Sequence, residues 1–192
     1  LPEALDKQRR RNAGFYVAKL RLDFNSDRSA AYRLECSVRR VIYILMNSAF
    51  GRFGRLGWTG EGLIAYMTWL VCRTHLVHYV RVGAQTEQSR KDGGAGRPDF
   101  AWLGAARRLA AKDELPELTY IVSVDLNAMT GEDAIGAYAF GVYLLAAQTE
   151  LITQFLHATS SGRETARASE VVLGYTLPEL DVRFRRWLRE TE

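Results

Sequence analysis

The sequence predicts an α+β fold in which five or six helices pack on a small sheet. Two segments, residues 15–24 and residues 118–126, alternate apolar and polar side chains with the period of two that is typical of half-buried strands. Longer segments carry apolar residues three or four positions apart, which is the spacing of amphipathic helices. The chain has 192 residues, a length that suits one domain. Both strands are therefore expected in one sheet of a single domain, residues 1–192.

The segment after the first strand, residues 29–50, fits two structures. Leu34, Val38 and Leu45 lie on one helical stripe. Residues 32–38 also alternate apolar with polar side chains, which would complete a hairpin with the first strand. The length of the segment favours a helix, because it is too long for one strand. The hairpin stays as the alternative.

The later elements are separated by glycine-rich stretches. A glycine-punctuated loop, residues 51–62, leads into an apolar helix expected over residues 59–82. Residues 84–98 are polar and glycine-rich and are expected to form a flexible loop. Thr130 and Asp133 have the spacing of a capping box, which indicates the start of a long helix. The remaining helices are expected over residues 100–112, 130–157, 164–173 and 178–190.

Charge is unevenly distributed along the chain. Residues 1–112 form a basic half with a balance of +11, and residues 113–192 form an acidic half with a balance of −7. Most of the basic side chains are arginine, whose planar guanidinium matches phosphate groups. A basic half of this kind indicates a nucleic acid or another polyanion as partner. The two halves could equally neutralise each other between copies, so self-association and other protein subunits are the alternative partners.

A candidate nucleic-acid interface lies in the loop of residues 51–62. Arginines alternate there with aromatic residues, and single strands are held in this way, with guanidinium groups on phosphates and rings on bases. Three further arginine pairs or runs extend the basic character of this half. The predicted nucleic-acid-binding residues are Arg9, Arg10, Arg11, Arg39, Arg40, Arg52, Phe53, Arg55 and Trp58.

Cys72, His75 and His78 carry side chains that can ligate a metal ion. At three-residue spacing on a helix they fan over about 120°, which is too wide an arc for one ion without ligands from elsewhere. We therefore predict that these residues bind no metal. No phosphate-loop or dinucleotide-binding signature is present, and no cofactor is expected.

A catalytic alternative rests on Arg73 and His78, which are separated by four residues. This spacing resembles the Arg-x4-6-His motif of the HEPN helical ribonucleases, which act on RNA without a metal. The resemblance implies that Arg73 would steady the phosphate and that His78 would donate or accept the proton. A metal-independent ribonuclease is therefore the alternative function.

The function expected from these features is a non-catalytic binding or assembly subunit of a larger complex, which contacts RNA or DNA through its arginines. A further alternative is an accessory subunit of a membrane-associated complex, because residues 134–149 are uncharged. That stretch is shorter than the roughly 20 residues of a spanning helix, so we expect it to be buried in protein. The two cysteines and the lack of a visible secretory signal favour an intracellular, reducing compartment, with the cytoplasm preferred.

Overall fold

The fold is all-α, and the predicted α+β class is wrong. The computed structural model describes the side chains of residues 30–51, 57–76, 102–126, 128–160 and 164–191, and the backbone of residues 14–17 and 22–25. About 78% of the part described with side chains is helical, and that part contains no strand. The predicted loop at residues 84–98 lies outside the described residues.

Helices follow one another along the described chain, and two of them, η3 and η4, are π-helical. The first, α2, is one continuous helix, which confirms the helical alternative for this segment. The helices are α2 (Ala30–Phe50), η3 (Trp58–Ile64), α3 (Ala65–Cys72), α5 (Trp102–Ala111), α6 (Leu118–Ile121), α7 (Gly131–Ala147), α8 (Ile152–Ser160), α9 (Thr165–Ala168), η4 (Ser169–Leu173) and α10 (Leu177–Glu190).

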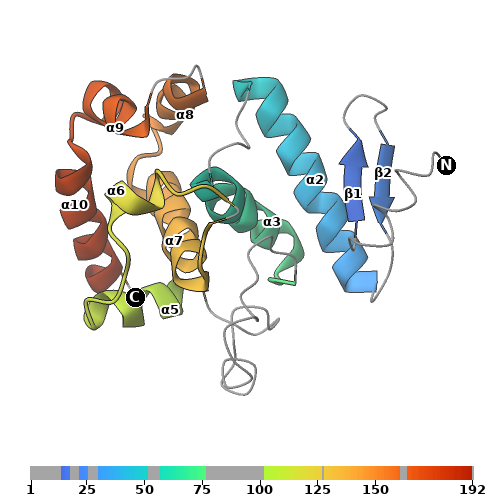
Figure 1. Ribbon diagram of the computed structural model, residues 1–192, viewed down its shortest axis with the longest axis horizontal. Helices are drawn as coiled ribbons and strands as arrows, with labels where there is room; N and C mark the ends of the chain where they lie inside the picture. The colour runs from blue at the N-terminus through green and yellow to red at the C-terminus, as the bar shows by residue number, and fades with distance from the viewer. Residues whose placement is uncertain are drawn as a thin grey trace.

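The first predicted strand is divided into two short strands. Strands β1 (Gly14–Val17) and β2 (Leu22–Asn25) pair antiparallel, with Gly14 opposite Asn25 and Val17 opposite Leu22. This hairpin lies beside α2 at the edge of the molecule, away from the central helices (Figure 1). It therefore contributes no layer of sheet on which the helices pack.

The second predicted strand, residues 118–126, is the short helix α6 followed by turns. Leu118 and Ile121 are both fully buried, three positions apart on one helical face, whereas Tyr120 is exposed. The helix begins where the Leu118 amide donates to Asp181 of α10, 3.2 Å away. The alternation of apolar residues is thus accidental, because a contact from a distant helix decides the local conformation.

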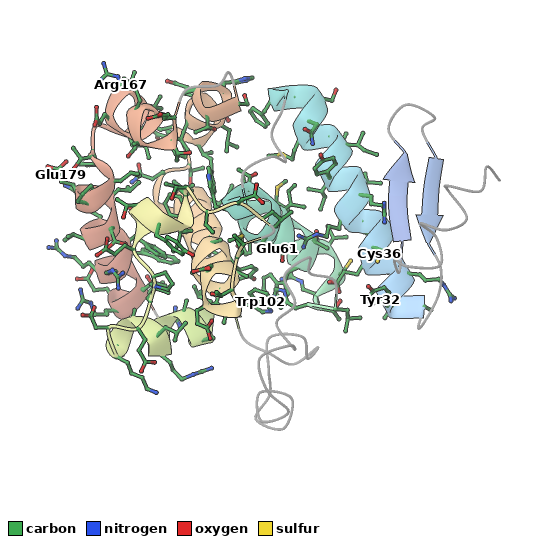
Figure 2. The ribbon with its side chains drawn as sticks, viewed as in Figure 1. Tyr32, Cys36, Glu61, Trp102, Arg167 and Glu179 are labelled. Atoms are coloured by element: carbon green, nitrogen blue, oxygen red, sulfur yellow. The ribbon has the colours of Figure 1, made fainter. Side chains whose placement is uncertain are left out.

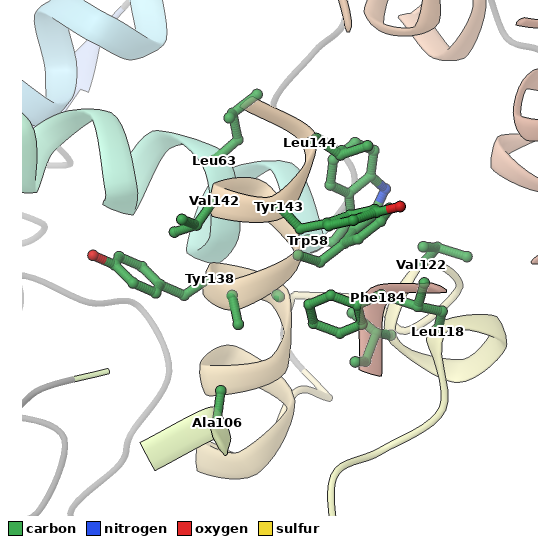
Figure 3. Packing of buried hydrophobic residues seen from close by; sticks show 14 of the residues in the cluster. Trp58, Leu63, Ala106, Leu118, Val122, Tyr138, Val142, Tyr143, Leu144 and Phe184 are labelled. Atoms are coloured by element: carbon green, nitrogen blue, oxygen red, sulfur yellow. The ribbon is translucent and has the colours of Figure 1, made fainter. Parts of the chain in front are cut away.

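Helix α7 is the centre of the fold (Figure 1). Its residues are buried from Asp133 to Leu144, which confirms burial for the first part of residues 134–149. The predicted burial ends there, because Ala146, Ala147 and Thr149 are exposed, and the helix expected over residues 130–157 is divided into α7 and α8. Side chains from η3, α6 and α10 surround it (Figure 3). No helix in the described part of the chain is long and apolar enough to cross a membrane.

Two helices begin with a capping box. The amide of Asp133 donates to the hydroxyl of Thr130 (3.2 Å), and the amide of Thr130 donates to the Asp133 carboxylate (2.8 Å), which confirms the predicted start of α7. Thr176 and Glu179 form the same arrangement at α10. The hydrogen bonds from Thr176 lower the pKa of the Glu179 carboxyl.

Candidate functional site

The buried face of helix α2 carries two charged side chains beside its apolar ones. A helix in a globular protein usually turns its apolar stripe toward the core. In α2 the residues that face the core are Glu35, Cys36, Arg39, Ile42 and Met46. This orientation places two charged side chains, Glu35 and Arg39, in the interior, where each needs a polar partner.

The apolar stripe of α2 lies on the surface. Leu34, Val41 and Leu45 are 59%, 55% and 61% exposed, and Val38 between them is half-buried. These four residues are called the outer seam below. The outer seam remains exposed although the β1–β2 hairpin lies beside α2 (Figure 1).

Arg39 is neutralised inside the protein by η3. Its guanidinium donates to the Glu61 carboxylate at 2.5 Å and to the Gly60 carbonyl at 2.8 Å. The side chains of Arg39 and Glu61 are 4% and 0% exposed, so this is a buried ion pair. Glu61 lies in the middle of the molecule in Figure 2. The pair joins α2 to the π-helical segment, where Glu61 occupies an interior position.

Glu35, the second charged residue of the inner face, accepts hydrogen bonds from the chain that follows α3. Its carboxylate accepts from the Thr74 hydroxyl and from the Leu76 amide, the latter at 2.8 Å. Burial, together with repulsion from Glu35, raises the pKa of the Cys72 thiol at the end of α3. Glu35 therefore fixes the chain that follows α3 against α2.

His75 is packed among aromatic rings. Its ring is parallel to Trp69 at 6.2 Å between centroids, and it lies 5.1 Å from both Trp102 and Tyr138. Burial, and to a smaller extent repulsion from Tyr66, raises the pKa of Tyr138.

Within the described residues no three His, Cys, Asp or Glu side chains are placed to hold a metal ion. His78 lies outside the described residues, so the metal prediction for Cys72, His75 and His78 stays a prediction.

Arg73 of the HEPN-like motif is exposed and ends α3 in a left-handed conformation, with φ of 57°. Its guanidinium lies 4.7 Å above the ring of Trp69, a cation–π arrangement. Its proposed partner, His78, is not among the described residues. The two side chains are therefore not placed relative to each other, and the ribonuclease alternative stays a prediction.

The nine predicted nucleic-acid-binding residues do not form one described surface. Trp58 is fully buried, with its ring 5.5 Å from Phe140 and 6.0 Å from Phe155, so it has no face for a base. The guanidinium of Arg39 is paired with the Glu61 carboxylate inside the protein, and the neighbouring Arg40 is half-buried on α2. The residues outside the described part are Arg9, Arg10, Arg11, Arg52, Phe53 and Arg55.

Comparison of the chain with protein-family models, with curated proteins and with solved structures gave no match. The outer seam of α2 consists of apolar side chains alone. It has no charge and no polar group of its own along its four residues, so it cannot orient a small polar substrate. It can bury apolar area against another chain.

In the sequence, Leu34, Val38 and Leu45 mark one stripe of the expected helix, but nothing there marks that stripe as a surface. Leu34, Val38, Val41 and Leu45 follow one another at intervals of four, three and four residues. That pattern would ordinarily indicate the face that a helix turns toward its own core. Its exposure follows from the orientation of α2 in the fold, in which Arg39 faces Glu61.

Proposed function

We propose that this protein is a non-catalytic binding or assembly subunit, and that the outer seam of α2 docks a helix of another chain. The observation that carries the proposal is the exposure of Leu34, Val41 and Leu45 in a row on one helix. Full burial of a leucine or valine side chain is worth about 1.5–3 kcal/mol, so covering the row would stabilise a complex. Contiguous apolar surface of this kind is typical of protein interfaces.

The polar groups behind α2 support a structural role for this region. Glu35 and the ion pair of Arg39 with Glu61 hold α2 against η3 and against the chain after α3. These contacts hold a long helix with its inner face inward. A rigid, pre-oriented face binds a partner at lower entropic cost than a mobile one.

The proposal predicts an assembly that depends on the outer seam. We expect the tagged chain, isolated under native conditions from the cells that produce it, to be part of a complex larger than its own 21.7 kDa. Leu45→Glu places a charge in the seam and should abolish this complex. The measurement is the native mass of the isolated material.

The matched control for this variant is Val182→Glu. Val182 is 57% exposed on α10, remote from α2 along the chain, so its substitution adds the same charge to an exposed apolar site. Val182→Glu should leave the complex intact. A wild-type chain with a native mass of 21.7 kDa under all conditions would contradict the proposed function.

A contact with nucleic acid is the second part of the proposal. It is supported by the +11 balance of residues 1–112 and by the preference for arginine. We expect Arg52→Ala with Arg55→Ala to reduce the slope of log affinity against log salt by about one to two units, because each lost phosphate contact removes roughly 0.7–0.9. The measurement is a fluorescence titration with single-stranded and double-stranded oligonucleotides at several salt concentrations.

The control pair for this titration is Arg186→Ala with Arg189→Ala. Both residues are exposed arginines of α10 in the acidic half, and their loss changes the net charge equally. The slope should keep its wild-type value in this variant. An equal reduction in both double variants, or no binding at low salt, would count against a localised nucleic-acid contact.

A further inference from the structure

We infer that the chain docked on the outer seam is a second copy of this protein, with the two α2 helices antiparallel. This inference rests on the proposed function, because it names the partner of the same surface. It starts from the spacing of Leu34, Val38, Val41 and Leu45, which is that of the a and d positions in a heptad repeat. Residues with this spacing form a continuous line along a helix that packs on another helix.

The outer seam matches itself about a two-fold axis. When a second α2 runs in the opposite direction with its centre between residues 39 and 40, Leu34 lies opposite Leu45 and Val38 lies opposite Val41. The next pair outward is Ala31 with Ser48, both small and both exposed. A two-fold interface of this kind uses the same patch on both subunits, which is the commonest arrangement in soluble oligomers.

The size of the side chains suits this register. In this register leucine pairs with leucine at both ends of the seam, and valine pairs with valine in its centre. Each layer therefore holds two residues of the same type. The small Ala31 and Ser48 let the helix backbones approach at the ends. α2 has 21 residues and is thus about 30 Å long, enough for the four layers of pairs and the small residues beyond them.

The charges around the outer seam also favour a second α2 over a charged partner. The seam itself carries none, and the residues on its outer flank, Ser37 and Ile44, are uncharged. A nucleic acid would find no positive group in this line, and a helix with charged residues at these positions would bury them without a counter-charge. A partner helix must therefore have uncharged residues at intervals of four, three and four, and α2 itself has them.

The inference is tested on the purified chain alone by sedimentation velocity over a dilution series. The wild-type chain should sediment as a dimer of 21.7 kDa subunits at high concentration. Leu45→Glu and Leu34→Lys should each raise the dissociation constant of the dimer at least about tenfold. Both positions are about 60% exposed, so these variants should fold as the wild type does, which circular dichroism checks. Val182→Glu, the exposed control on α10, should keep the wild-type constant.

A mixture of the two seam variants tests the antiparallel register. In that register Glu at position 45 of one copy faces Lys at position 34 of the other, while the remaining leucines face each other. The mixture should therefore form a heterodimer at concentrations at which each variant alone is monomeric. A mixture that stays monomeric would overturn the antiparallel pairing, since parallel helices would place each new charge opposite a leucine.

A purified wild-type chain that is monomeric at every concentration would overturn the pairing of two copies. If the native complex then contained a different chain and was still lost in Leu45→Glu, the outer seam would remain a docking surface with another partner. If no complex formed in either experiment, both proposals would be overturned.

Discussion

Replacing Arg39 by alanine is expected to destabilise the protein by about 3–5 kcal/mol. The substitution leaves Glu61, which is 0% exposed in its side chain, as a buried carboxylate without its cation. It also removes the donor to the Gly60 carbonyl at 2.8 Å. The free energy of unfolding, measured by urea denaturation followed by circular dichroism, tests this expectation.

A double variant separates the unpaired charge from the loss of packing. Arg39→Met with Glu61→Leu replaces the ion pair by apolar side chains of similar length, and such exchanges are often neutral or stabilising. The double variant should therefore recover most of the stability that Arg39→Ala loses. If the double variant is at least as unstable as Arg39→Ala, the buried ion pair is worth more than its desolvation cost, contrary to this expectation.

Replacing Gly62 by alanine is expected to cost about 3 kcal/mol, at the upper end of the usual range for overpacking. A Cβ atom at this position would lie 2.3 Å from the carbonyl oxygen of Ala137 and 2.7 Å from its carbonyl carbon. Both atoms belong to the backbone of α7 and cannot rotate away. Relief would require η3 to move off the central helix, with loss of packing along the whole contact. Thermal and urea unfolding measure the cost.

Gly60→Ala is the matched control for Gly62→Ala. Gly60 lies in the same π-helical segment, and an added Cβ there would meet no atom within 4 Å. Alanine should be tolerated, and up to about 1 kcal/mol could be gained from its better helix propensity. An equal loss of stability in both variants would mean that the segment itself requires glycine, rather than the close approach of η3 to α7.

Local signals in the sequence were sufficient for several elements. The length of the segment that became α2 favoured a helix over a hairpin, and α2 is a helix. Thr130 and Asp133 marked the start of α7, and both hydrogen bonds of the capping box are present. The last helix is also placed correctly, since α10 (Leu177–Glu190) covers the expected residues 178–190. These features depend on residues within a few positions of one another.

Two predictions depended on distant contacts and could not be made correctly from pattern alone. The alternation in residues 118–126 has the period of a strand, but the Leu118 amide is held by Asp181 at the start of a helical turn. Trp58 was expected to face a nucleic acid because arginines surround it in the sequence. Its neighbours in space are Phe140 and Phe155, which lie far from it along the chain.

By itself, the sequence determined that α2, α7 and α10 are helices, because length, capping residues and the spacing of apolar side chains act locally. Only the tertiary structure decided which face of α2 is inside. That choice depends on Glu61, 22 positions away from Arg39, whose carboxylate makes a buried guanidinium acceptable. With the charged face neutralised in the interior, the row from Leu34 to Leu45 is turned outward, where burial requires another chain.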